Sequence, residues 1–228
     1  ALLHPLIAVW LFPQLRPLLN GPALWAAAIV FTGFLMLPLT WENTLSAFQV
    51  QFYFLIGAAV VLLAYLPLHP AGSLRWWMGV AAGVFSLGSM GSAFIAPVAA
   101  IVVISLKSWQ RRAWSKSDTV SMLVCAALAT TGVALMVHIS VHDGLRAPNL
   151  AIFLNMLQRA AAYPWPHSYH FWFLVQAPFL IWVGLRIREF RKPWSQPEWF
   201  ALGLAGWVAA QTIGLCYARG NYHGYLAP

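Results

Sequence analysis

One acidic residue, Glu42, heads a polar face on an otherwise apolar segment, TWENTLSAFQVQFYF, residues 40–54. At helical spacing it shares this face with three other polar side chains, Ser46, Gln49 and Tyr53. Lipid cannot satisfy a polar face, so the pattern predicts that it looks into a helix bundle, a cavity or a partner. Glu42 is therefore a candidate functional carboxylate. The alternative is a helix N-terminal carboxylate favoured by the helix dipole, with Gln49 joining two helices.

A second group of chemically active side chains lies in HISVHD, residues 138–143. His138 and His142 are four apart and could share a metal on one helical face. His138 and Asp143 also have the spacing of a His-x4-Asp acyltransferase motif, which belongs to a mixed α/β domain that this sequence does not predict. Membrane di-iron enzymes need several histidine boxes, and this chain has one. We therefore favour an interfacial His–Asp pair at a helix end and predict no metal site.

The third candidate is Arg219, in the sequence CYARGNYHGYLAP near the C-terminus. An arginine followed by glycine suits a phosphate, because the planar guanidinium offers paired donors and the glycine backbone permits close approach. The alternative is an arginine that extends to the membrane surface and anchors the end of a helix.

The composition indicates what must position these residues. The chain is 61% hydrophobic and only 8% charged, with thirteen tryptophans. A soluble domain of this size is about 25% charged, so the sequence predicts an integral membrane protein. The net charge is +8, and the basic residues that produce it lie in short clusters between apolar runs. Loops of membrane proteins have this pattern, so the charge does not indicate a nucleic-acid partner.

We expect an all-α, polytopic transmembrane bundle of about seven or eight membrane segments. Two runs, 76–90 and 92–106, are each short for a span. The break between them at residues 89–92, followed by Pro97, favours a kinked or re-entrant pair. Residues 150–163 have one apolar face and predict a helix lying in the interface. The predicted helices are 1–12, 22–40, 46–67, 76–90, 92–106, 118–138, 150–163, 169–186 and 197–217.

The basic residues predict the orientation of these segments. Clusters at 107–116 and 186–192 are expected on the cytoplasmic side. If 76–106 is a helix pair, the segments that carry Glu42, Asp143 and Arg219 then all lie on the outer face. If 76–106 is one tilted helix, Glu42 lies on the opposite side.

We expect residues 1–228 to form a single transmembrane domain, and we expect it to be part of a longer chain. The chain lacks an initiator methionine, and its first apolar run is too short for a span of about 20 residues.

Two of these segments together resemble a group of bacterial membrane proteins related to the GT-C glycosyltransferase superfamily. In that group a Trp-Glu-Asn segment leads into a Phe-Gln-x-Gln-Phe helix, and an Ala-Arg-Gly segment follows late in the chain. The matching residues are Trp41, Glu42, Asn43, Phe48, Gln49, Gln51, Phe52, Ala218, Arg219 and Gly220.

The resemblance implies a protein of the bacterial inner membrane that takes a sugar from a polyprenyl-phosphate donor on the extracytoplasmic side. The candidate catalytic carboxylates are Glu42 and Asp143. The candidate substrate-binding residues are Asn43, Gln49, His142 and Arg219. In GT-C enzymes the principal carboxylate usually lies in the first outer loop, which here would precede Ala1. Glu42 would then support the site or bind the acceptor.

Two other classes remain open. A non-enzymatic structural or accessory subunit of a larger membrane complex would explain the sparse charges and the aromatic surface. A small-solute transporter predicts broken helices near the membrane midplane, and only the break at 88–97 fits that description. Membrane lipid is an expected partner in every case, and the sequence leaves any cofactor requirement open.

Overall fold

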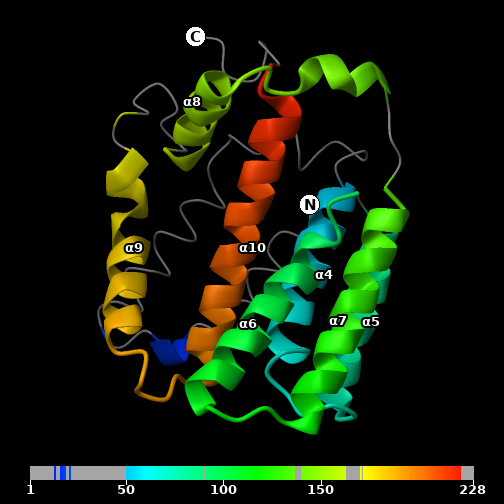
Figure 1. The fold of residues 1–228 in the computed structure, drawn as a ribbon, viewed down its shortest axis with the longest axis vertical. Coiled ribbons are helices and arrows are strands. Elements are labelled where there is room, and N and C mark those ends of the chain that lie inside the picture. Colours follow the sequence, from blue (N-terminus) through cyan, green and yellow to red (C-terminus); the bar gives the residue numbers. More distant parts are fainter. Residues whose placement is uncertain are drawn as a thin grey trace. The chain divides into compact units, whose positions relative to one another are not determined.

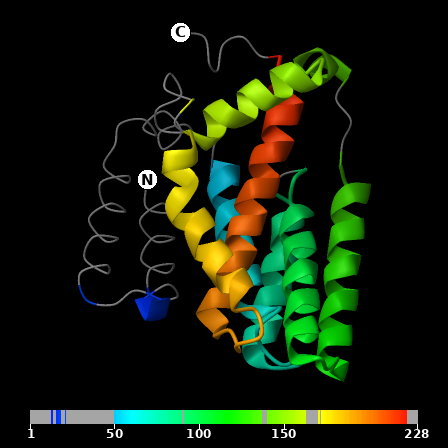
Figure 2. The ribbon, with the colours of Figure 1, turned by 60° about the vertical axis from the view of Figure 1, so that its left-hand side comes forward.

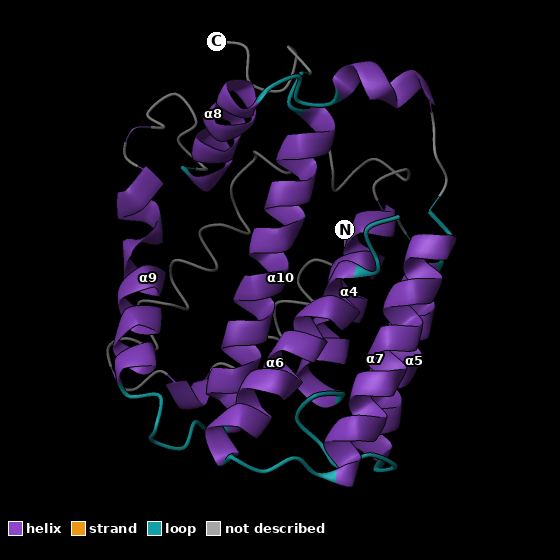
Figure 3. Ribbon diagram, viewed as in Figure 1, coloured by secondary structure: helices purple, strands orange, loops and turns teal. Residues whose placement is uncertain are grey.

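The computed structural model describes residues 13, 16–18, 21, 50–89, 91–136, 140–162, 170 and 172–221. Helix is the regular structure throughout these residues, which confirms the all-α prediction (Figure 3). The predicted helices at 1–12 and 22–40 lie outside them. The elements are η1 (Arg16–Leu18), α4 (Val50–Tyr65), α5 (Leu74–Leu87), α6 (Ile95–Arg111), α7 (Lys116–Ala134), η4 (Ser140–Leu145), α8 (Leu150–Ala161), α9 (Trp172–Arg188) and α10 (Gln196–Arg219).

The chain divides into two compact units. The first unit comprises residues 1–136 and 194–204, and the second comprises 137–193 and 205–228. Helix α10 therefore begins in the first unit and ends in the second.

Four consecutive helices form the described core of the first unit. Helix α4 packs against α5 and α6, and α7 packs against the same two helices. Short connections reverse the chain between neighbours, so that the four helices alternate in direction (Figure 1). The segment that opens α10 joins this unit, where the buried rings of Trp194 and Trp199 lie 4.7 Å apart. The largest fully buried side chains of the unit include Leu62, Leu63, Leu66, Val103 and Ile104.

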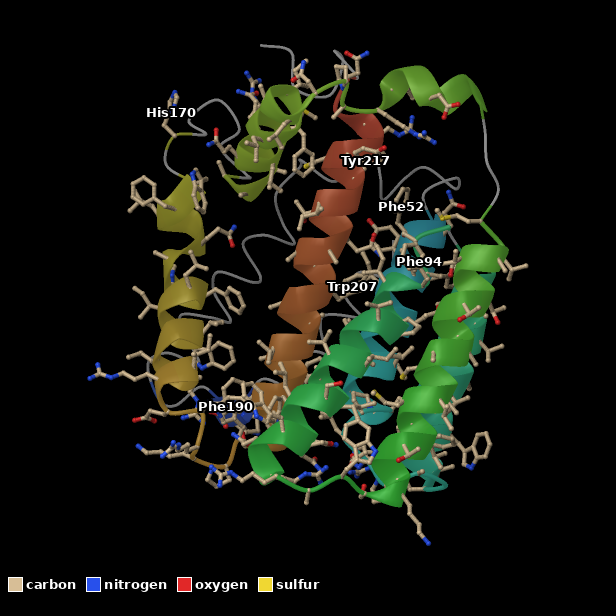
Figure 4. All side chains as sticks on the ribbon, viewed as in Figure 1. Phe52, Phe94, His170, Phe190, Trp207 and Tyr217 are labelled. Atoms are coloured by element: carbon tan, nitrogen blue, oxygen red, sulfur yellow. The ribbon has the colours of Figure 1, made fainter. Side chains whose placement is uncertain are left out.

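Glycines allow these helices to approach closely. A Cβ atom at Gly79 would lie 2.7 Å from the backbone nitrogen of Leu66, which lies just beyond the end of α4. A Cβ at Gly132 of α7 would lie 3.0 Å from the Cβ of Phe94, the residue that precedes α6 (Figure 4). Small residues at helix contacts are typical of membrane bundles.

The predicted break between 76 and 106 separates two distinct helices. Helix α5 ends at its cap residue Gly88, and α6 begins at Ile95 after a turn. Pro97 lies in the first turn of α6, where a helix tolerates proline because that backbone nitrogen needs no intrahelical acceptor. Helix α6 continues to Arg111, beyond the predicted end at residue 106.

The described second unit contains η4, α8, α9 and the last part of α10. Asn149 caps α8 by accepting a hydrogen bond from the backbone N–H of Ile152 at 2.9 Å. Helix α8 contacts α9, and Gln176 of α9 donates to the carbonyl of Ala161 at 2.9 Å. No residue of α8 is fully buried, and the helix runs crosswise to the end of α10 (Figure 2). This placement matches a helix with one apolar and one polar face.

Two of the described helices, α7 and α10, are long and apolar enough to cross a membrane. Less than a third of each apolar stretch is buried within the protein. Large apolar side chains such as Leu123 and Ile213 are exposed on these helices. The fold is therefore helical, with two helices that fit a membrane by length and composition.

Candidate functional site

The structure brings together the segments that carry Asp143 and Arg219. The backbone N–H of Ala147 donates to the carbonyl of Tyr217 at 2.8 Å, near the C-terminal end of α10 (Figure 4). The backbone N–H of Asn221 donates to the carbonyl of Leu145 at 3.0 Å, and its side-chain amide donates to the carbonyl of Gly144 at 2.9 Å. Three hydrogen bonds thus hold the end of η4 and the turn after it against the end of α10.

Gly220 makes this close approach possible. A Cβ atom at this position would lie 2.6 Å from the Cβ of Ala147 and 2.7 Å from the carbonyl oxygen of Cys216. Both distances are shorter than a carbon atom tolerates, and the second involves backbone that cannot rotate away. The glycine that follows Arg219 is therefore required by packing, independently of any ligand.

The charged side chains at this junction differ in their partners. Asp143 forms an ion pair with Arg146 at 2.9 Å, and both side chains are nearly half exposed. An exposed pair of this kind contributes about 0.2–1 kcal/mol to stability. Arg219 is partly buried and makes no ion pair with any residue that the structure describes. Among the described charged groups at this junction, the guanidinium of Arg219 is the one without an ion pair, which leaves it open to an anion.

The other predicted site residues are described less fully. Glu42, Asn43 and Gln49 lie outside the described residues, as does His138. His142 lies within η4, directly before Asp143, and only its backbone is described.

A second polar cluster, which the sequence analysis did not single out, lies where α6 meets α7. Asp118 is only 5% exposed. Its Oδ2 accepts hydrogen bonds from the Ser115 backbone N–H at 3.0 Å, the Ser115 hydroxyl at 2.6 Å and the Arg111 guanidinium at 2.7 Å. The ammonium of Lys107 lies 3.8 Å from Oδ1. We call these four residues the Asp118 cluster.

Hydrogen bonds also link this region to the loop between α4 and α5. Lys107 donates to the carbonyl of Pro67. The backbone N–H of Ala71 donates to the hydroxyl of Ser117 at 2.7 Å. The cluster and these bonds together fasten the α4–α5 hairpin to the α6–α7 hairpin.

Burial and the positive charge of this region both affect the pKa of His69, which lies in the same loop. Burial lowers the pKa of its imidazole, and the positive charges of Arg75 and Lys107 lower it further. The imidazole is therefore held in its neutral form to lower pH than a free histidine.

One part of the Asp118 cluster was visible in the sequence. Ser115 and Asp118 form a complete capping box, in which each side chain accepts from the other's backbone N–H. The Ser-x-x-Asp spacing before an apolar run is the usual sign of this motif. Lys107 and Arg111 were interpreted only as orientation signals, and nothing in their spacing indicates that they share a carboxylate with the cap.

The described structure indicates a class of protein but does not by itself indicate an activity. The described residues form a helical protein with two helices that fit a membrane, and no three of their histidine, cysteine or acidic side chains group as metal ligands. No known protein family, curated protein or solved structure matches the chain with significant similarity. Its function must therefore be argued from its own residues.

Proposed function

We propose that the chain is a polytopic protein of the bacterial inner membrane, with about seven or eight membrane segments, that transfers a sugar from a polyprenyl-phosphate donor at the outer face. The resemblance of its Trp-Glu-Asn and Ala-Arg-Gly segments to GT-C glycosyltransferases prompts this proposal. The observation that carries it is the set of three hydrogen bonds that hold the turn after Asp143 against the end of α10, beside Arg219.

The chemistry of inverting transfer requires two kinds of side chain. A carboxylate takes the proton of the acceptor hydroxyl as the new bond to the sugar's anomeric carbon forms. A cation stabilises the phosphate that leaves as the old bond to that carbon breaks. Asp143, partly open to solvent, supplies a carboxylate, and Arg219 supplies the cation. Glu42 is the second candidate carboxylate.

The exposed apolar side chains of helix α8 favour a lipid-linked substrate in this proposal. Its first residue, Leu150, is 69% exposed, and Leu154 is 45% exposed, one helical turn later. An amphipathic helix with exposed leucines lies with its apolar face among acyl chains. A polyprenyl chain can therefore lie beside α8 while its phosphate approaches the junction at the end of α10.

The decisive experiment measures transfer from a labelled polyprenyl-phosphate sugar by purified full chain in lipid. We expect Glu42→Gln, Asp143→Asn and Arg219→Ala each to reduce turnover about a hundredfold or more. Arg191→Ala removes an exposed arginine that forms no ion pair with a described residue, and it should leave turnover unchanged. Full turnover in all three site variants, with folded protein, would refute the proposal.

One observation favours the alternative, a non-enzymatic subunit of a membrane complex. Asp143 is already paired with Arg146, as expected of a carboxylate that fixes a turn. In that case Asp143→Asn and Arg146→Gln should have equal effects, on stability and on recovery of partner proteins. If Asp143 is a base, only its own variant should abolish turnover.

A further inference from the structure

One end of the first unit combines cations with exposed tryptophans. At this end α4 and α6 finish, and α5 and α7 begin (Figure 1). We call it the basic end, and its exposed members are Arg75, Trp77, Trp109, Arg112, Trp114 and Lys116.

The connection between α6 and α7 is rigid. Arg112 ends α6 in the left-handed conformation, with φ of 51°, and its N–H donates to the carbonyl of Trp109 at 3.0 Å. The indole N–H of Trp114 donates to the hydroxyl of Thr119 at 2.6 Å. The capping box fixes the next residue, Ser115. The backbone of this loop therefore has one defined conformation, which lowers the entropic cost of binding.

The cations at this end divide into two groups. Lys107 and Arg111 interact with the carboxylate of Asp118. The other three, Arg75, Arg112 and Lys116, are exposed and make no ion pair with a described residue. The other described acidic residue of this unit, Glu198, accepts hydrogen bonds from Ser195 at the start of α10. An excess of positive charge therefore faces outward.

The tryptophans indicate what these cations face. Trp77, Trp109 and Trp114 are 56%, 69% and 51% exposed. Tryptophan is enriched where a membrane meets water, because its ring is apolar and its N–H is polar. The neighbouring Leu74 and Met78 on α5 are also exposed, so apolar surface continues directly from the charged end. An acidic protein partner would account for the cations but not for this continuation.

We propose that the basic end binds the phosphate headgroups of anionic phospholipids in the membrane leaflet around it. The guanidinium of Arg112 and the ammonium of Lys116 contact phosphate, and the tryptophans lie at headgroup depth. The inference rests on the membrane placement and is independent of sugar transfer, because it concerns the first unit and involves none of the proposed site residues.

The experiment titrates detergent-purified full chain with acyl-labelled phosphatidylglycerol and follows binding by fluorescence anisotropy, without any sugar donor. Arg112→Ala/Lys116→Ala should weaken binding about tenfold or more at low salt, because each cation near an anionic surface contributes to attraction. The charge-preserving double variant Arg112→Lys/Lys116→Arg should retain most of it. The matched control, Arg188→Ala/Arg191→Ala, removes two cations of the second unit and should weaken binding less than threefold.

Three results would overturn the proposal. Equal losses in the two alanine double variants would mean that net charge alone attracts the lipid. Equal binding of labelled phosphatidylcholine would mean that acyl chains alone suffice. Displacement by millimolar inorganic phosphate would identify a site for a free anion. Loss of sugar transfer in the variants of Asp143 or Arg219 does not affect this measurement, so the two proposals fail separately.

Discussion

Replacing Asp118 by alanine should destabilise the first unit more than the loss of any exposed ion pair would. The substitution removes the acceptor of three hydrogen bonds and the capping box of α7. It also leaves Lys107, whose side chain is 17% exposed, without its counter-charge. The side chain of Arg111 is 46% exposed and can turn to solvent, so the loss of its contact with Asp118 costs little stability.

The separate effects give the expected size. Loss of an N-terminal cap costs about 1 kcal/mol. Loss of the exposed contact with Arg111 adds less than about 1 kcal/mol. Lys107 keeps its hydrogen bond to Pro67 but loses its counter-charge, which for a largely buried cation adds about 1–3 kcal/mol. A total of about 3 kcal/mol corresponds to a decrease in Tm of about 10 °C for a chain of this length.

The assay follows intrinsic tryptophan fluorescence of the purified full chain during heating in detergent. Asp118→Ala should lower Tm by about 10 °C, whereas Asp143→Ala, which breaks an exposed pair, should lower it by less than about 4 °C. Adding Lys107→Met to Asp118→Ala should recover part of the loss, because it removes the orphaned charge. A decrease no larger than that of Asp143→Ala, or no recovery in the double variant, would refute the reasoning.

Two further predictions concern the junction at α10 and the loop at His69. Gly220→Ala should lower Tm by several degrees and reduce sugar transfer, because the new methyl group overlaps Ala147. The control is Gly206→Ala, since no described atom lies within 4 Å of a Cβ at that position. Equal effects of the two variants would contradict the close packing at Gly220. His69 has a pKa below its ordinary value of 6.5, so its contribution to stability is present above that pH and is lost as the pH falls through the lowered pKa. His69→Gln should therefore flatten the decrease in Tm between pH 7 and 5, and an unchanged slope would contradict this linkage.

Much of the helical fold could be predicted because apolar run length is a local signal. The predicted runs at 46–67, 118–138 and 150–163 overlap α4, α7 and α8. The end of α6 was predicted too early, because Lys107 and Arg111 interrupt the apolar run. Both cations pair with the carboxylate of Asp118, and Lys107 also donates to a carbonyl of the other hairpin. Such partners are not visible in the run itself.

The candidate site could be predicted only in outline. Charge patterning predicted that Asp143 and Arg219 share one side of the membrane, which stays a prediction. The backbone hydrogen bonds of Ala147 with Tyr217 and of Asn221 with Leu145 depend on how two distant segments fold, and no local pattern encodes them. Glu42 carries the strongest sequence signal and lies outside the described residues.

The hydrogen bonds between the α4–α5 and α6–α7 hairpins have a consequence for folding during translation. The hydrogen bond between Ala71 and Ser117 spans 46 residues, which a ribosome takes about 2–9 seconds to add. The α4–α5 hairpin therefore leaves the ribosome before its partner hairpin has emerged. Lys107 likewise emerges before Asp118, so the ion pair between them can form only after α7 has begun to emerge. The contacts that join the two hairpins through Ser117 and Asp118 therefore form late, after both helices of the first hairpin have been made.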